Sequence, residues 1–155
     1  MKNELKNAEV FGTDISENAL VVARQNAIKN NLDVDFFQAD ILKWEKIDWK
    51  TFDVIVSNPP YIRESEKKLI HPNVINHEPA SALFVADSNP LVFYRSIAIF
   101  AKKQLSGNGL LFFEINENLG SEMKKMLICF GFSEIEIRKD INRKNRMVCC
   151  RNSTQ

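Results

Sequence analysis

The sequence has few cysteines and glycines, no long apolar run and no excess of charge of either sign. Its 155 residues include 21 lysines and arginines against 20 acidic residues, and the net charge of +1 provides no general attraction to nucleic acid. No apolar stretch approaches the roughly 20 residues that cross a bilayer, and the amino terminus does not resemble a signal peptide. We therefore expect a cytoplasmic, monomeric protein that binds neither membranes nor DNA directly.

The cysteines and histidines give no support for metal or disulfide chemistry. Cys129 lies within an apolar helical pattern, and Cys149 and Cys150 are neighbours near the end of the chain. This spacing fits neither a disulfide framework nor a zinc site, so we expect buried, reduced thiols. His71 and His77 lack carboxylates or cysteines at ligand spacing, so we interpret them as exposed loop residues and expect no metal.

The remaining composition, 45% hydrophobic and 26% charged, is typical of a globular domain, which we assign to residues 1–155. Strand and helix patterns alternate along the chain, and this order predicts an α/β fold with a mainly parallel sheet and helices on both faces. The predicted strands cover residues 10–14, 34–40, 52–57, 110–115, 134–138 and 147–150. The predicted helices follow a cap at Ser16, follow a cap at Asn89 with Pro90 as first helical residue, and run from about Leu119 to Phe130.

The most informative stretch is the apolar strand pattern Phe52–Ser57 followed by Asn-Pro-Pro-Tyr. The β-branched residues suit a strand buried on both faces of a parallel sheet, and the two prolines hold Asn58 rigidly at its carboxyl end, where open α/β sheets bind ligands. The Asn58 side chain and the Pro59 carbonyl offer two acceptors that suit an –NH2 group, and Tyr61 offers a flat wall. The alternative is a purely structural turn.

Acidic residues end the two preceding strands. Asp14 stands where an acid binds the ribose hydroxyls of a nucleoside, and Asp40, at the end of the next strand, can reach an adenine amino group. Taken singly, each acid is more typical of a helix cap or a solvated loop. Because carboxyl ends of parallel strands meet at one edge, Asp14, Asp40 and Asn58 together predict a nucleoside cofactor beside an amino-group pocket.

Several short motifs extend this interpretation. They are, in chain order, Phe11–Ser16, Ala23–Ala27, Gln38–Asp40, Ser57–Ile62, Glu78-Pro79 with Ala82-Leu83, and Phe113–Ile115. Together they resemble the HemK family, the protein release factor glutamine methyltransferases, and the resemblance extends from Val10 to Cys150. The Asn-Pro-Pro-Tyr motif is shared with DNA and RNA amino methyltransferases, whereas Glu78-Pro79, Leu83 and Phe113-Glu114 favour the release-factor branch.

The resemblance implies a Rossmann-like class I methyltransferase fold with a closing antiparallel strand. It implies methyl transfer from S-adenosylmethionine to the side-chain amide of the glutamine in the Gly-Gly-Gln motif of a peptide chain release factor. Asp14 would bind the ribose, Asp40 with Ile41 would flank the adenine, and Asn58 would border the cofactor. The implied substrate-binding residues are Asn58, Pro59, Pro60 and Tyr61, and all but Pro60 are implied to be catalytic.

The sequence departs from the family in two larger features and one smaller one. The family has a glycine-rich loop after its first strand and a helical amino-terminal domain, and the residues before Val10 supply neither. The missing strand lies at the centre of the family's sheet, so its absence leaves two unpaired inner edges. Gly107–Gly109 is expected in a helix-to-strand turn. Arg143 stands where the family often has glycine, and we expect Asn142 to take the left-handed position.

We therefore hypothesise that the chain is a truncated part of a longer enzyme, or begins at an internal methionine of one. Two alternatives to the release-factor reading stay open. The first is a nucleic-acid amino methyltransferase, which would flip an adenine or guanine base against Tyr61. The second is a non-catalytic remnant of the fold.

The absent glycine-rich loop leads to a prediction about cofactor affinity. Because that loop cradles the methionine part of S-adenosylmethionine in the family, we expect the 155-residue chain to bind the cofactor weakly. Isothermal titration of the purified chain with S-adenosylmethionine measures this directly. Ordinary micromolar affinity would contradict the truncation hypothesis.

Overall fold

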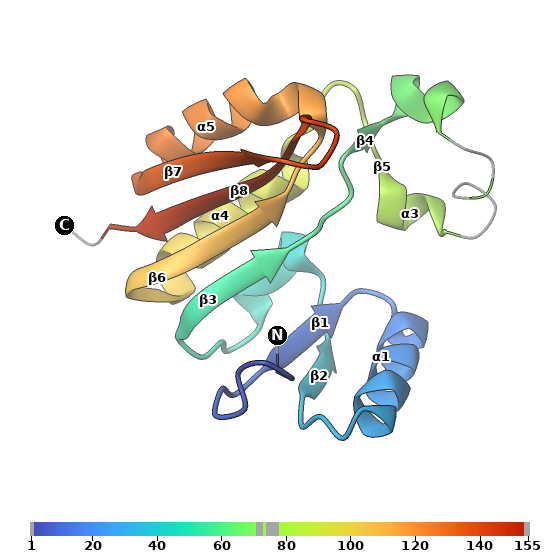
Figure 1. Ribbon diagram of the computed structural model, residues 1–155, viewed down its shortest axis with the longest axis vertical. Coiled ribbons are helices and arrows are strands. Elements are labelled where there is room, and N and C mark those ends of the chain that lie inside the picture. Colours follow the sequence, from blue (N-terminus) through green and yellow to red (C-terminus); the bar gives the residue numbers. More distant parts are fainter. Residues whose placement is uncertain (1, 71–72, 74–77, 154–155) are drawn as a thin grey trace. The chain divides into compact units, whose positions relative to one another are not determined.

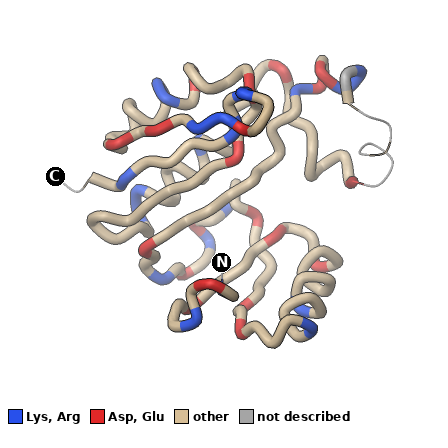
Figure 2. The backbone as a smooth tube through the Cα atoms, in the orientation of Figure 1, with Lys and Arg blue, Asp and Glu red and all other residues tan. Residues whose placement is uncertain are grey.

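The computed structural model describes residues 2–70, 73 and 78–153, so His71 and His77 lie outside the described residues. Backbone contacts divide the chain into two compact units, Met1–Ile47 and Asp48–Gln155, and each is described by itself (Figure 1). Lysines and arginines are interspersed with acidic residues along each unit (Figure 2).

The first unit is a strand–helix–strand arrangement followed by a short helix. Its elements are β1 (Phe11–Asp14), α1 (Glu17–Lys29), β2 (Asp35–Gln38) and the 3₁₀ helix η1 (Ile41–Lys46). The strands β1 and β2 pair in parallel, with Gly12 opposite Phe36. A Cβ atom on Gly12 would lie 2.6 Å from the Phe36 ring, so glycine allows this close approach. As predicted, Ser16 caps α1, and its side chain accepts a hydrogen bond from Ala19 N at 3.3 Å.

The second unit is built on a four-stranded sheet in the order β3–β6–β8–β7. Its strands are β3 (Phe52–Ser57), β6 (Leu105–Glu114), β7 (Phe132–Lys139) and β8 (Asn145–Asn152). The helices α4 (Val92–Gln104) and α5 (Gly120–Cys129) pack against the sheet and touch each other, and the 3₁₀ helix η3 (Glu117–Leu119) precedes α5. The fully buried side chains of this core include Tyr94, Leu111, Phe113, Ile115, Met123, Leu127 and Val148.

The long connection between β3 and α4 contains short regular elements. They are β4 (Ile62–Arg63), the 3₁₀ helix η2 (Glu64–Leu69), α3 (Ala80–Leu83) and β5 (Phe84–Val85). β4 and β5 form a parallel pair of two residues each. The connection is therefore folded back on itself beside the end of β3.

The predicted fold class is confirmed, since β1–β2, β3–β6 and β4–β5 are parallel pairs and β8 runs antiparallel to both of its neighbours. β3 forms an edge of the four-stranded sheet as described. Among the described helices, none is both long and apolar enough to cross a membrane.

The predicted burial of β3 on both faces is wrong. Val54 is 40% exposed and Val56 is 58% exposed. Val54 and Val56 lie on the same face of β3, since alternate residues of a strand do, and a face is buried only where another layer packs on it. The residue types favour a buried parallel strand, but they do not show which of its faces is covered.

Two boundaries near α4 differ from the prediction. The helix begins at Val92 rather than Pro90, because Asn89 and Pro90 form a preceding turn in which Asn89 O accepts from Val92 N. β6 begins at Leu105, five residues earlier than predicted, and Gly107–Gly109 lies within it. The register shifts there, since Phe52 pairs with Leu105 and Val54 with Leu110. The predicted turn is thus a bulge in a longer strand.

The structure also differs from the predictions in the β7–β8 turn and at two of the cysteines. Arg143 itself has φ of 62° and takes the left-handed position that was predicted for Asn142. Gly131 after α5 has φ of 75°, which confirms the predicted glycine end of that helix. Cys129 is exposed and Cys149 half-buried, so buried thiols are confirmed for Cys150 alone.

Candidate functional site

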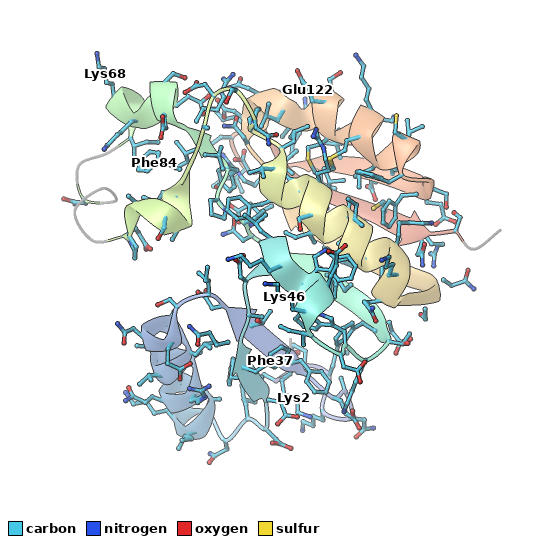
Figure 3. All side chains as sticks on the ribbon, turned by 180° about the vertical axis from the view of Figure 1, so that it is seen from behind. Lys2, Phe37, Lys46, Lys68, Phe84 and Glu122 are labelled. Carbon is cyan, nitrogen blue, oxygen red and sulfur yellow. The ribbon has the colours of Figure 1, made fainter. Side chains whose placement is uncertain are left out.

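The first unit carries an open hollow of about 370 Å³ at the carboxyl ends of β1 and β2. Its size is in the range of small-molecule pockets, about 300–1,000 Å³. Ala39 N donates to Asp14 O at 3.0 Å, which extends the β1–β2 ladder and brings both acidic strand ends to one edge. The residues that line the hollow are Ile15, Gln38, Ala39, Asp40, Lys43, Lys46 and Ile47, and Lys46 projects from η1 (Figure 3).

Asp14 and Asp40, which lie at this edge, each also accept a hydrogen bond from the backbone two residues later. Asp14 Oδ1 accepts from Ser16 N at 2.8 Å. Asp40 Oδ1 accepts from Leu42 N at 2.9 Å, and its Oδ2 lies 3.0 Å from Lys43 Nζ. The bond to Lys43, followed by the Leu42 N–H, lowers the pKa of Asp40, so this carboxylate is ionised. Because a carboxylate oxygen accepts more than one hydrogen bond, capping does not exclude a ligand.

Sequence reasoning missed Ile15, which forms an apolar wall of the hollow although it is 60% exposed. Gln38 Nε2 donates to Ile15 O at 2.8 Å and fixes this part of the loop. An apolar residue directly after a strand-ending acid is the signal that could have identified it. Ile41 follows Asp40 in η1 but does not line the hollow.

The second unit carries a smaller pocket of about 70 Å³ at the carboxyl end of β3. Asn58, Pro59, Tyr61 and Ile62 line one side, and Ala82 and Leu83 of α3 line the other. The volume is about twice the roughly 30 Å³ that a water occupies in the liquid, which suits a small planar polar group. Within residues 2–70, 73 and 78–153, neither the Asn58 side chain nor the Pro59 carbonyl has a hydrogen-bond partner. Two acceptors are therefore available at this pocket.

Tyr61 is held at both ends. Its hydroxyl donates to Glu114 Oε1 at 2.7 Å, and its backbone carbonyl accepts from Asn116 Nδ2 at 3.2 Å. Burial, and then the contact with Glu114, raise the pKa of Tyr61 to about 12, so it remains a neutral phenol. Pro60 is half-buried and does not line the pocket.

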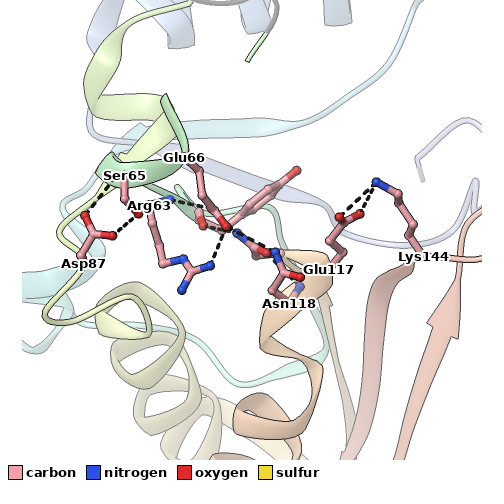
Figure 4. Close-up of polar contacts among 9 residues, drawn as sticks. Arg63, Ser65, Glu66, Asp87, Glu117, Asn118 and Lys144 are labelled. Atoms are coloured by element: carbon pink, nitrogen blue, oxygen red, sulfur yellow. Dashed lines mark hydrogen bonds and ion pairs between the residues drawn. The ribbon is translucent and has the colours of Figure 1, made fainter. Parts of the chain in front are cut away.

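A half-buried carboxylate, Glu66, ties the segment after β3 to the residues that follow β6 (Figure 4). Glu66 accepts from Arg63 N at 3.1 Å and Arg63 Nη2 at 2.7 Å. It also accepts from Asn116 Nδ2 at 2.8 Å and Asn118 Nδ2 at 3.3 Å. Burial disfavours the charged form, but the bonds from Arg63 and Asn116 outweigh it and lower the pKa of Glu66 to about 2. These residues, which local sequence patterns did not reveal, position the segment that begins at Asn58.

The predicted site residues therefore form two groups. Asp14 and Asp40 meet at one edge of the first unit, while Asn58, Pro59 and Tyr61 line one pocket of the second. The binding and catalytic roles that the resemblance implies for these residues stay predictions, including the contribution of Asn58 to cofactor binding.

Comparison with known proteins gives consistent matches. The family described as "Methyltransferase domain" matches residues 1–92. A release factor glutamine methyltransferase of Flavobacterium psychrophilum is 45% identical over 96% of this chain and 52% of its own length. One of Bacteroides thetaiotaomicron is 39% identical over 96% of this chain and 53% of its own length. The chain thus spans about half the length of these relatives, and the predicted resemblance is confirmed.

Solved structures agree on the fold. A methyltransferase of Pyrococcus furiosus matches with a TM-score of 0.71 and 21% identity, over 99% of this chain and 68% of its own. A putative methyltransferase of Streptococcus mutans, solved in complex with SAH, matches with a TM-score of 0.55 and 16% identity, over 92% of this chain and 75% of its own. Both likenesses support the Rossmann-like methyltransferase fold.

The low pKa of Glu66 predicts an acid-sensitive contribution to stability. The pKa falls from an ordinary 4.5 to about 2 in the folded protein. The stabilisation is therefore fully present above pH 4.5 and is lost as the pH falls towards 2. We expect Glu66→Gln to lower the free energy of unfolding by about 2 kcal/mol at neutral pH, allowing for partial solvent screening, and by little near pH 2.

Urea unfolding of the wild type and Glu66→Gln over this pH range measures the difference. Glu64→Gln, which changes an exposed carboxylate of the same short helix, is the matched control. A difference between the wild type and Glu66→Gln that does not vary with pH would contradict the assignment.

Proposed function

Because this chain belongs to the methyltransferase-domain family, we propose that it serves methyl transfer from S-adenosylmethionine to the side-chain amide nitrogen of a glutamine in a peptide chain release factor. The release-factor substrate is supported by the two relatives that are 45% and 39% identical, both release factor glutamine methyltransferases. Such a substrate would place the protein where translation ends, in the cytoplasm.

The observation that carries the amide assignment is the 70 Å³ pocket between the Asn-Pro-Pro-Tyr segment and α3. A primary amide has two N–H donors on one nitrogen, and the pocket offers the Asn58 side-chain oxygen and the Pro59 carbonyl. Pro59 and Pro60 have no backbone N–H, so these two residues add no donor that would favour a carbonyl instead. The exocyclic amino group of a flipped nucleobase offers the same two donors, so the choice of a glutamine amide is supported by the relatives that are release factor glutamine methyltransferases.

Accepting both N–H groups would help the reaction in two ways. An amide nitrogen is a poor nucleophile because its lone pair is delocalised, so its orientation toward the methyl donor matters greatly. Two acceptors fix that orientation, and their partial negative charges stabilise the positive charge that develops on nitrogen. The face of the Tyr61 ring would limit rotation of the amide. No separate base is needed before transfer: the methyl–sulfur bond would break as the methyl–nitrogen bond forms, S-adenosylhomocysteine would leave, and the extra proton on nitrogen would pass to water afterwards.

The hollow of the first unit fits the adenosine part of the cofactor. Ile15 offers an apolar surface for a flat base, and the Asp40 carboxylate is an acceptor for an amino group. The Lys43 side chain that pairs with Asp40 is 64% exposed, so that contact is weak and can yield to a ligand. Asp14, exposed at the same edge, would accept from ribose hydroxyls. S-adenosylmethionine would supply the methyl group to be transferred.

Side-by-side assays distinguish the three candidate functions. The protein is incubated with saturating S-adenosylmethionine and, separately, a bacterial release factor, duplex DNA and RNA, and products are analysed by mass spectrometry. We expect a methyl group on the Gly-Gly-Gln glutamine. Methylation of DNA or RNA instead would establish the nucleic-acid alternative, and no transfer to any substrate would contradict catalysis by this chain, as the remnant and the truncation hypotheses both predict.

The amide-binding role predicts a selective kinetic defect. Asn58→Ala removes one of two positioned acceptors, and loss of one such group costs about a hundredfold to a thousandfold in kcat. We expect this loss with little change in the dissociation constant of the cofactor. Steady-state kinetics and equilibrium binding measure the two quantities.

Asn89→Ala is the matched control, because Asn89 also precedes a proline but lies in the turn before α4. Equal losses of turnover and cofactor affinity in Asn58→Ala would contradict the amide-binding role.

A further inference from the structure

Asn116 is a buried amide whose N–H groups and oxygen all have partners. Its side chain is 6% exposed. Its Nδ2 donates to Tyr61 O at 3.2 Å and to Glu66 Oε2 at 2.8 Å, and its Oδ1 accepts from Asn118 N at 2.9 Å. Turning the amide over would place its oxygen against two acceptors and its NH2 group against a donor. The three contacts therefore fix one orientation of the Asn116 side chain.

The Tyr61 carbonyl is one of two backbone anchors for the segment that lines the pocket. The other anchor is Ser57, which pairs with Phe113 of β6. The segment between them contains two consecutive prolines, whose rings fix φ and leave the backbone few ways to turn. The direction of the Pro59 carbonyl therefore depends on both anchors, and Asn116 holds the anchor that follows it in the chain.

The bond from Asn116 to Glu66 strengthens this hold. A hydrogen bond to a carboxylate is stronger than one between two neutral groups. The carboxylate is itself fixed, because it accepts from Arg63 N at 3.1 Å and from Arg63 Nη2 at 2.7 Å. One nitrogen of Asn116 thus joins the pocket segment to η2. Asn116 with its bonds to Tyr61 and Glu66 is here called the Asn116 clamp.

We propose that Asn116 is a positioning residue for methyl transfer, which keeps the Pro59 carbonyl in place as an acceptor by holding the Tyr61 carbonyl through the Asn116 clamp. The proposal rests on the proposed function and deepens it. Asn116 is not among the residues that line the pocket. Its effect on the ligand amide therefore passes through the backbone between Pro59 and Tyr61.

The bond to the Tyr61 carbonyl can be tested by NMR without cofactor or substrate. The chain has 2 tyrosines, Tyr61 and Tyr94, and of these Tyr61 alone is followed by isoleucine. Protein labelled with carbonyl-¹³C tyrosine and ¹⁵N isoleucine therefore shows a one-bond carbon–nitrogen coupling at Tyr61, which identifies its signal. The Tyr94 carbonyl is the internal reference. A carbonyl carbon signal moves to lower chemical shift when its hydrogen bond is lost.

Asn116→Ser is the informative variant. Serine is a good cap residue, so its hydroxyl keeps an acceptor for Asn118 N, while the NH2 group that binds Tyr61 and Glu66 is lost. We expect the Tyr61 carbonyl signal to move to lower chemical shift and the Tyr94 signal to stay in place. Asn116→Asp keeps the size and the oxygen of the side chain and removes the same N–H groups, so it provides the same test should Asn116→Ser not fold.

Asn152→Ser is the matched control. Asn152 is 2% exposed, and its Nδ2 also donates to two acceptors, Leu105 O at 3.2 Å and Ser106 O at 3.3 Å. These contacts lie at the start of β6, whereas Asn116 follows its end. We therefore expect Asn152→Ser to destabilise the protein and to leave the Tyr61 signal unchanged. An unchanged Tyr61 signal in Asn116→Ser, or the same shift in both variants, would overturn the proposal.

Steady-state kinetics test the consequence for transfer. We expect Asn116→Ser to lower kcat about tenfold, because the Pro59 acceptor is held less precisely, with the dissociation constant of the cofactor unchanged. Asn152→Ser should keep the wild-type kcat at a temperature at which both variants are folded. An unchanged kcat in Asn116→Ser, or equal losses in the two variants, would overturn the proposal. If wild-type protein transfers no methyl group, the proposed function fails, while the Tyr61 carbonyl signal still decides whether Asn116 holds that carbonyl.

Discussion

The hydrogen bond from Tyr61 to Glu114 connects a pocket at the end of an edge strand to an interior strand of the sheet. β3 pairs with β6 on one side, and its apolar residues are partly exposed. Such a strand does not by itself fix the segment that follows it. β6 is paired on both sides and ends beside the buried residues Phe113 and Ile115. The pocket therefore derives its geometry from β6, through Glu114 and Asn116, more than from the strand that leads into it.

This dependence explains which features the sequence could predict. Ser16, Gly131 and the strand Phe52–Ser57 were predicted correctly because their signals are local: a cap, a left-handed end and a β-branched run. The contacts of Glu66 with Asn116 and of Tyr61 with Glu114 join residues about 50 positions apart. The residues next to each of these positions in the sequence give no signal of the distant partner, so the sequence did not predict these contacts. The exposure of one face of β3 was missed for the same reason, since it depends on which distant segments pack on that face.

The two strand-ending acids show that a residue can cap the local backbone and still be available to bind a ligand. Asp14 and Asp40 each accept from the backbone two residues later, as ordinary caps do. That bond also fixes the carboxylate at the strand end and, for Asp40, together with Lys43 keeps it ionised. A preorganised acceptor is what a nucleoside site requires. Capping and ligand binding use the same geometry, and a local motif alone does not separate them.

The chemistry of the pocket follows from what its lining residues lack. Pro59 and Pro60 have no N–H groups, and the Tyr61 hydroxyl donates its proton to Glu114. The groups left facing the pocket are the Asn58 side chain, the Pro59 carbonyl, an aromatic ring and the apolar side chains of Ile62, Ala82 and Leu83. Among these groups, a ligand carbonyl or carboxylate would find a donor in the Asn58 side-chain NH2, whereas a ligand –NH2 group would find both the Asn58 oxygen and the Pro59 carbonyl as acceptors. In the proposed function the pocket would therefore favour a nitrogen donor, because the two prolines have no N–H and the Tyr61 hydroxyl proton is used by Glu114.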